Sequence, residues 1–179
     1  MRPLDSLPNE TVQTILHKIA PGSHLQSVEL LAGSFSNHTH LVEASLPGGQ
    51  PLKLVVRRYQ VYGNYDRGEK ARREFKAFEL IHNHGIPGPE ALLLDDTGEF
   101  LGVPGIVTRF VPGALRLDAP DEPLPWARSL AVMLAKIHAI PLDEHARSFL
   151  LEANSEATWF LQGDAAPKFM QKFPGGTRL

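Results

Sequence analysis

The sequence has 179 residues, of which 42% are hydrophobic and 21% are charged, and its formal net charge is −2. This composition is typical of a globular protein with a real core, either one ordinary domain or one and a half lobes of a two-lobed enzyme. The weak negative charge argues against nucleic acid or an anionic membrane as the main partner, because both require a basic face. The absence of cysteine excludes disulfides, thiolate metal sites and cysteine nucleophiles.

The N-terminal part of the chain predicts one helix and then three strands. Apolar residues at helical spacing predict a helix over residues 9–20, with Asn9 as its N-cap and Pro21-Gly22 at its end. Three strand-like runs rich in Val, Leu and Thr follow at residues 25–32, 38–46 and 52–59. Apolar and polar residues alternate in the second run, which is typical of a half-buried antiparallel strand. These runs predict a three-stranded meander.

A second helix is predicted to begin at Asp66, because Asp66 and Glu69 have the D-x-x-E spacing of a capping box. Its apolar residues share one face, and Gly85 ends it. Two more strands are expected at residues 90–94 and 105–111, and two more helices at residues 126–140 and 143–153. Consecutive strands without long crossovers pair antiparallel. The order therefore predicts an α+β fold with a five-stranded antiparallel sheet that carries a helix.

A glycine- and serine-rich segment separates the first two predicted strands, and it consists of Gly33, Ser34, Phe35, Ser36 and Asn37. A loop that covers phosphate needs small residues, because backbone N–H groups must approach the anionic oxygens closely. Taken alone, the pentapeptide fits an ordinary hairpin turn better. Its context favours the phosphate-covering interpretation.

Further motifs follow this segment in a defined order. They are Leu54-Val55-Val56-Arg57-Arg58, Arg73-Glu74-Phe75, Gly85-Ile86-Pro87-Gly88-Pro89, Phe110-Val111-Pro112-Gly113 and Leu134-Ala135-Lys136-Ile137-His138-Ala139. In this order the chain resembles the N-terminal lobe, hinge and first C-lobe helices of the aminoglycoside phosphotransferase and choline kinase-like family, which has a protein kinase-like fold. Each motif alone is weak evidence, but the ordered set is much stronger.

The resemblance implies that Arg57 and Glu74 form the pair of strand cation and helix carboxylate that grips the α- and β-phosphates of a nucleotide. Arginine suits this role because its guanidinium is always ionised and can donate to a carboxylate and a phosphate from one rigid fork. Arg58 is the alternative, since neighbouring strand residues face opposite sides and only one of the two can face the site. For Glu74 the alternative is an exposed helix acid paired with a nearby lysine.

The resemblance also implies that Thr108, Arg109, Phe110 and Val111 form the hinge, where adenine is held mainly by backbone N–H and C=O groups. An acidic residue is common in the family at the position of Arg109. Without the family context, the segment is an edge strand that ends at a Pro-Gly turn.

Three other motifs are not expected to be sites. His38 and His40 share a strand face but have no evident third ligand for a metal. His82-Asn83-His84 lies at a predicted helix end, where histidine interacts favourably with the helix dipole. Gly163-Asp164 is followed by Phe169 where the family's catalytic loop has a metal-binding asparagine.

Full members of the family transfer the γ-phosphate of ATP, with magnesium, to a hydroxyl group of a small molecule. We expect an N-lobe at residues 1–111, a hinge and linker at 112–125 and a partial helical C-lobe at 126–179. No H-x-D-x-x-x-x-N loop follows residue 141, so we expect neither catalytic nor metal-binding residues in this chain. We expect a truncated C-lobe, with the hydroxyl acceptor and magnesium bound only when the missing C-lobe residues are present. The chain alone would then bind ATP weakly and be inactive.

The alternative function is a non-catalytic nucleotide-binding or protein-interaction module. In that case the apolar face of the 126–140 helix, with Leu130, Leu134 and Ile137, offers a surface for docking or self-association. The sequence does not distinguish ATP from GTP. No signal peptide follows Met1, and the most apolar helix is too short to span a bilayer, so we expect a cytoplasmic protein with no membrane partner.

Overall fold

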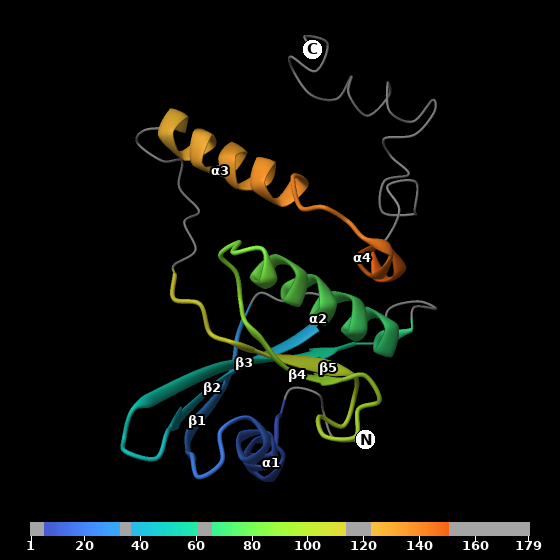
Figure 1. The fold of residues 1–179 in the computed structure, drawn as a ribbon. Coiled ribbons are helices and arrows are strands. Elements are labelled where there is room, and N and C mark those ends of the chain that lie inside the picture. Colours follow the sequence, from blue (N-terminus) through green and yellow to red (C-terminus); the bar gives the residue numbers. More distant parts are fainter. Residues whose placement is uncertain (1–5, 33–36, 61–65, 114–122, 151–179) are drawn as a thin grey trace. The chain divides into compact units, whose positions relative to one another are not determined.

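The computed structural model describes residues 6–32, 37–60, 66–113 and 123–150 (Figure 1). The chain divides into two compact units, Met1–Pro141 and Leu142–Leu179. Its elements follow in the order α1 (Asn9–Ile19), β1 (His24–Leu30), β2 (Asn37–Ser45), β3 (Pro51–Tyr59), α2 (Arg67–Asn83), β4 (Ala91–Asp95), β5 (Gly105–Arg109), α3 (Pro123–His138) and α4 (Glu144–Phe149). The predicted sequence of helices and strands is therefore confirmed over the described residues, with differences of a few residues at the ends of elements.

The five strands form one sheet in the order β1-β2-β3-β5-β4, and every neighbouring pair is antiparallel. This arrangement confirms the predicted five-stranded α+β fold. The strand β5 lies between β3 and β4, so the last strand in sequence occupies a central place and the fourth lies at the edge. As a result, the segment that leaves β5 begins beside the strand that carries Arg57.

Each face of the sheet is covered by one helix, α1 on one side and α2 on the other (Figure 1). Along β3 the side chains alternate between the two faces, as the period of two in a strand requires. Leu54 and Val56 are buried in the larger core together with Ile15 and Leu16 of α1. Burial of each such side chain contributes roughly 1.5–3 kcal/mol to stability. The sequence pattern predicted both helices but not that they would take opposite faces.

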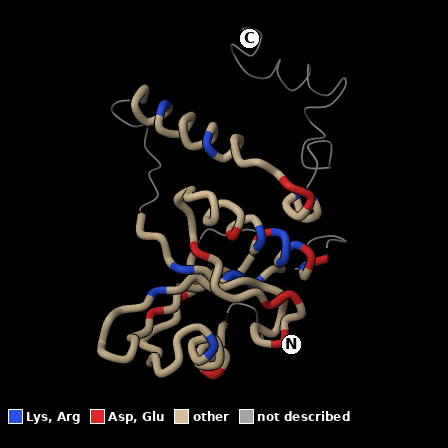
Figure 2. Tube along the Cα trace, in the orientation of Figure 1, with Lys and Arg blue, Asp and Glu red and all other residues tan. Residues whose placement is uncertain are grey.

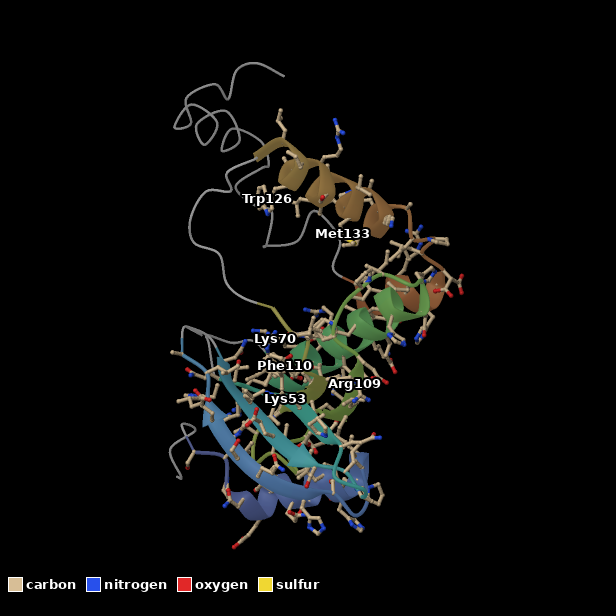
Figure 3. The ribbon with its side chains drawn as sticks, turned by 90° about the vertical axis from the view of Figure 1, so that its left-hand side faces the viewer. Lys53, Lys70, Arg109, Phe110, Trp126 and Met133 are labelled. Carbon is tan, nitrogen blue, oxygen red and sulfur yellow. The ribbon has the colours of Figure 1, made fainter. Side chains whose placement is uncertain are left out.

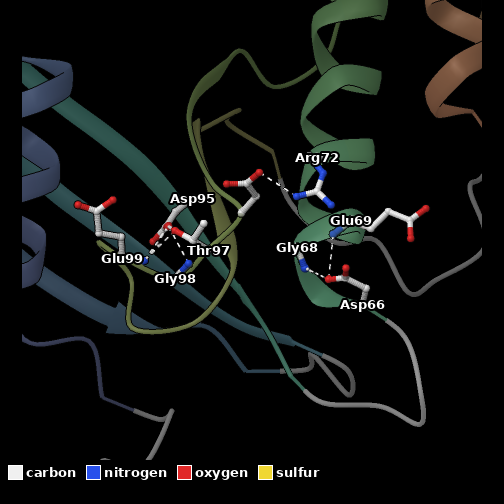
Figure 4. A network of polar contacts seen from close by, with 9 residues as sticks. Asp66, Gly68, Glu69, Arg72, Asp95, Thr97, Gly98 and Glu99 are labelled. Carbon is white, nitrogen blue, oxygen red and sulfur yellow. Dashed lines mark hydrogen bonds and ion pairs between the residues drawn. The ribbon is translucent and has the colours of Figure 1, made fainter.

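The smaller core lies under α2 and contains Tyr59, Ala71 and Ile106. The helix begins as predicted, because the carboxylate of Asp66 accepts hydrogen bonds from the amides of Gly68 at 2.8 Å and Glu69 at 3.2 Å (Figure 4). The predicted N-cap of α1 was wrong: Pro8 precedes the helix without a side-chain cap, and Asn9 is its first residue. Proline precedes a helix readily because it supplies no N–H group that would need a partner there.

The first turns of α2 are docked on the loop that joins β4 and β5. Arg72 donates to Asp96 at 2.8 Å, and an added Cβ on Gly68 would lie only 2.4 Å from the Asp96 carbonyl oxygen. Glycine is therefore required where the helix approaches this loop. Because both contacts fix α2 along its axis, they also set where Glu74, further along the same helix, lies relative to β3.

The same loop is organised by Asp95, whose side chain is only 2% exposed. One carboxylate oxygen accepts from the amides of Gly98 and Glu99 at 2.8 and 2.9 Å (Figure 4). The other oxygen accepts from the amides of Phe100 and Leu101 at 2.8 and 2.6 Å. Four backbone donors on one buried carboxylate make the loop a rigid unit, since a buried charge is tolerated only when it is fully hydrogen-bonded.

We predict that Asp95→Asn lowers the free energy of unfolding by roughly 2–3 kcal/mol, because the amide NH₂ would face backbone donors. The neighbouring Asp96→Asn is the matched control. It removes only a partly exposed ion pair with Arg72 and should cost less than about 1 kcal/mol. Urea unfolding of the two variants measures the difference, and equal losses would contradict the role given to Asp95.

Candidate nucleotide site

The two neighbouring arginines of β3 lie on opposite faces of the sheet. Arg57 is paired with Thr39 of β2 and Ile106 of β5, and it lies on the α2 side. Arg58 is directed to the α1 side, where it is 5% exposed and donates to the Ser6 carbonyl oxygen at 2.8 Å. Burial lowers the pKa of Arg58 from its usual value. Arg58 thus ties the segment before α1 to the sheet.

Arg57 and Glu74 form an ion pair between β3 and α2, in which Nη1 of Arg57 donates to Oε1 of Glu74. The two side chains are 38% and 22% exposed, so the pair is only partly withdrawn from water. Seventeen residues separate them in sequence. The contact that the family resemblance implied is therefore present. Glu74 pairs with a residue of the sheet and not with a lysine of its own helix.

Tyr59 is a third member of this group, and the sequence did not point to it. Its hydroxyl donates to Oε2 of Glu74 at 2.6 Å, while its ring is fully buried. Burial, together with the hydrogen bond to Glu74, raises the pKa of the Tyr59 phenol well above its usual range. A tyrosine two residues after Arg57 lies on the same strand face, which is the one signal that could have indicated it.

A pocket of about 290 Å³ lies on this side of the sheet. Arg57 and Glu74 contribute its charged wall, and aliphatic and aromatic side chains contribute most of the rest. The lining residues come from β2, β3, α2 and β5, and from the segments after β1, between α2 and β4, and after β5: Leu31, Thr39, Val55, Arg57, Glu74, Phe78, Pro89, Ile106, Thr108, Arg109, Phe110 and Val111. An apolar pocket with a few convergent polar groups is typical of a small-molecule site.

All four predicted hinge residues line this pocket. Thr108 is 6% exposed and pairs with Val55 in the sheet, whereas Val111 is 52% exposed. The amide of Arg109 donates to the Glu90 carbonyl oxygen at 2.9 Å, and the amide of Phe110 donates to the Lys53 carbonyl oxygen at 3.1 Å. These two amides are committed to the fold, so a base in the pocket would be held by other backbone groups of the segment.

The charge of Arg109 is directed to Glu90, which lies 2.6 Å away just before β4. Lys53 is held by Glu43 at 2.6 Å and lies 5.9 Å from the centre of the Phe110 ring. Figure 3 shows Lys53, Arg109 and Phe110 near this end of the sheet. Ion pairs and a cation–π contact thus support the segment after β5 from both sides.

The remaining predicted residues belong to the glycine- and serine-rich segment. Gly33, Ser34, Phe35 and Ser36 lie outside the described residues. Asn37 begins β2 and is paired with Tyr59 in the sheet, and the amide of Leu31 donates to the Thr39 carbonyl oxygen at 2.8 Å. Leu31 and Asn37, on either side of residues 33–36, are therefore anchored to the sheet next to Arg57 and Tyr59.

The histidines form no metal centre in the part of the chain that the structure describes, where no group of three or more His, Cys, Asp or Glu side chains could hold a metal ion. His40 is 1% exposed. His84 Nδ1 lies 2.9 Å from the Leu80 carbonyl oxygen, so this ring closes the end of α2 as expected of a helix terminus.

Charge and apolar surface are distributed differently over the helices. Figure 2 shows residues of both signs along α2, whereas α3 exposes apolar side chains, among them Trp126, Leu130 and Leu134. Self-association through α3 stays a prediction. Among the described helices none is long and apolar enough to cross a bilayer.

The sequence model of the Phosphotransferase enzyme family matches residues 27–172, so the chain belongs to this family. No curated protein matches the sequence. A solved structure of a putative aminoglycoside phosphotransferase from Ralstonia eutropha JMP134 is 17% identical, with a TM-score of 0.56 over 93% of this chain and 46% of its own. The GDP and kanamycin complex of APH(2")-IIIa is 19% identical, with a TM-score of 0.52 over 90% of this chain and 56% of its own. The chain thus spans about half the length of these two structures, and their likeness confirms the kinase-like fold.

Because Arg57 and Arg58 lie on opposite faces of the sheet, we expect them to contribute differently to the stability of the fold. We expect Arg58→Met to lower the free energy of unfolding by roughly 1–3 kcal/mol, because the hydrogen bond from the buried Arg58 side chain to the Ser6 carbonyl oxygen is lost. Arg57→Met should cost less than about 1 kcal/mol, because its ion pair is partly exposed. Urea unfolding of both variants checks this order, and a larger loss from Arg57→Met would reverse the assignment of faces.

Proposed function

We propose that this chain is the nucleotide-binding part of a kinase that transfers phosphate from ATP to a hydroxyl group of a small molecule. The observation that carries the proposal is the Arg57–Glu74 ion pair on the wall of an apolar pocket. A cation on the third strand that is oriented by a helix carboxylate is the arrangement that neutralises nucleotide phosphates in kinase-like enzymes.

The chemistry of the pocket fits the two halves of a nucleotide. Val55, Ile106 and Phe78 offer apolar surface for a base, while the Arg57 guanidinium offers N–H donors and a fixed positive charge for phosphate oxygens. Family membership and a related fold with bound GDP support nucleotide binding. That related complex also contains kanamycin, a small molecule with hydroxyl groups, and this supports a small-molecule hydroxyl acceptor here.

Magnesium does not fit the described residues. Both carboxylate oxygens of Glu74 already accept hydrogen bonds, from Arg57 and Tyr59, and no other acid among the described residues lines the pocket. We therefore assign no metal-dependent step to these residues. Their contribution to phosphoryl transfer would be to position the nucleotide and neutralise its charge. For the whole protein, the proposal also includes catalytic acids, a site for the acceptor and a cytoplasmic location.

The proposal predicts that Arg57→Met weakens ATP binding by about tenfold to a hundredfold, the loss expected for a charge-assisted contact, and leaves adenosine almost unchanged. The difference arises because adenosine lacks the charge that Arg57 neutralises. Calorimetric titration of both ligands, with GTP and guanosine in parallel, measures it. Arg58→Met is the control and should not change the ratio of ATP to adenosine affinity. No binding of any nucleotide at millimolar concentration would sink the proposal.

A second prediction concerns the base. Thr108→Leu adds volume to the inner wall of the pocket without adding charge. We expect ATP and adenosine affinity to fall by the same factor, roughly tenfold, since overpacking of this kind costs on the order of 1–3 kcal/mol. The same titrations measure both ligands. A loss confined to ATP would show that the base does not lie beside Thr108.

A further inference from the structure

Tyr59 is held in one place by the fold. It is the last residue of β3, its backbone amide donates to the Pro104 carbonyl oxygen at 2.9 Å, and its ring is fully buried in the core with Ala71 and Ile106. The ammonium group of Lys70 lies 5.2 Å from the ring centre. A side chain confined in this way can hold a hydrogen-bond partner in a fixed orientation.

The hydroxyl of Tyr59 and the guanidinium of Arg57 divide the Glu74 carboxylate between them. Oε2 accepts from Tyr59 at 2.6 Å, and Oε1 accepts from Nη1 of Arg57. A carboxylate that faces an arginine alone commonly rotates to a bidentate pair, in which two parallel N–H donors are consumed. With one oxygen held by Tyr59, Glu74 offers Arg57 a single oxygen.

This division matters for the pocket because Arg57 lines it and keeps 38% of its side chain exposed. A guanidinium has five N–H donors in a fixed fork, so an arginine that spends fewer of them on its carboxylate can offer more to a phosphate. The raised pKa of the Tyr59 phenol means that it remains a hydrogen-bond donor at neutral pH. Its hydroxyl therefore serves to hold the carboxylate, and supplies no proton to the reaction.

We propose that Tyr59 is a positioning residue for nucleotide binding, whose hydroxyl limits Glu74 to a one-oxygen contact with Arg57 and so keeps guanidinium donors for phosphate. This inference rests on the function proposed above. It goes beyond it by assigning a role to a residue that the sequence motifs do not include. A tyrosine that only filled the core would need its ring and not its hydroxyl.

The test compares wild type with Tyr59→Phe, which removes one oxygen atom and keeps the ring. Calorimetric titration of the 179-residue chain with ATP and with adenosine should show ATP affinity about fivefold or more lower and adenosine affinity unchanged. Partial unfolding would reduce both affinities by the same factor, so the ratio of the two reports on phosphate contact alone. An unchanged ratio in Tyr59→Phe would overturn the inference.

Two further variants sharpen the test. Glu69→Gln is the matched control, since it removes the partly exposed ion pair with Arg73 on the same helix and should leave the ratio unchanged. In a Glu74→Met background, Tyr59→Phe should have no further effect on ATP, because Tyr59 acts through Glu74. A further ATP-specific loss in that background, or an equal change in Glu69→Gln, would also overturn the inference.

The same titrations separate this inference from the proposed function. Failure of wild type to bind ATP would remove the function itself. Normal binding by wild type with an unchanged ratio in Tyr59→Phe would remove only the role of Tyr59. If Tyr59→Phe does not fold, Glu74→Gln is used instead, because it leaves the Tyr59 ring unchanged. The amide nitrogen of the new glutamine would then face a donor, either the Tyr59 hydroxyl or the Arg57 guanidinium. This variant should show the ATP-specific loss, and an equal loss of both ligands would contradict the inference.

Discussion

The ion pair between Arg57 and Glu74 depends on the alternation of side chains along β3, and most of what the fold does for function follows from it. Because Arg57 is on the α2 side, its neighbour Arg58 must be on the α1 side, where it is buried and binds the Ser6 carbonyl. One arginine is thus committed to the stability of the fold and the other to the pocket. A shift of one residue in the register of β3 would exchange these roles and bury the wrong charge.

The elements around this pair act mainly by fixing distances. The loop organised by Asp95 is rigid, and α2 is docked on it through Gly68 and Arg72, so the helix cannot slide along the sheet without breaking these contacts. Figure 4 shows the two networks on either side of this junction. The position of Glu74 is therefore set by contacts of Gly68 and Arg72, which precede it on the same helix, and Tyr59 sets the orientation of its carboxylate.

Much of this could be predicted from the sequence. Alternation in the strands, the Asp66 cap and the order of motifs were sufficient for the five-stranded α+β fold and for the Arg57–Glu74 pair. The contribution of Tyr59 could not be predicted, because a tyrosine at the end of a strand gives the same sequence pattern whether or not its hydroxyl forms a hydrogen bond. The fourfold use of Asp95 was also hidden, since the sequence of an Asp-Asp-Thr-Gly turn is the same whether its first carboxylate is exposed or buried. Such contacts depend on tertiary neighbours that no local pattern records.

The most direct test of the account is a map of amide chemical shifts in the ¹⁵N-labelled chain during titration with ATP. We expect changes in β3 around Arg57, in α2 around Glu74 and in the Thr108–Val111 segment, all on the α2 side of the sheet. A larger hollow of about 740 Å³ lies along α1 on the other side, lined by residues from Asn9 to Leu25. Changes confined to that hollow, with none around Arg57 and Glu74, would contradict the assignment of the nucleotide site.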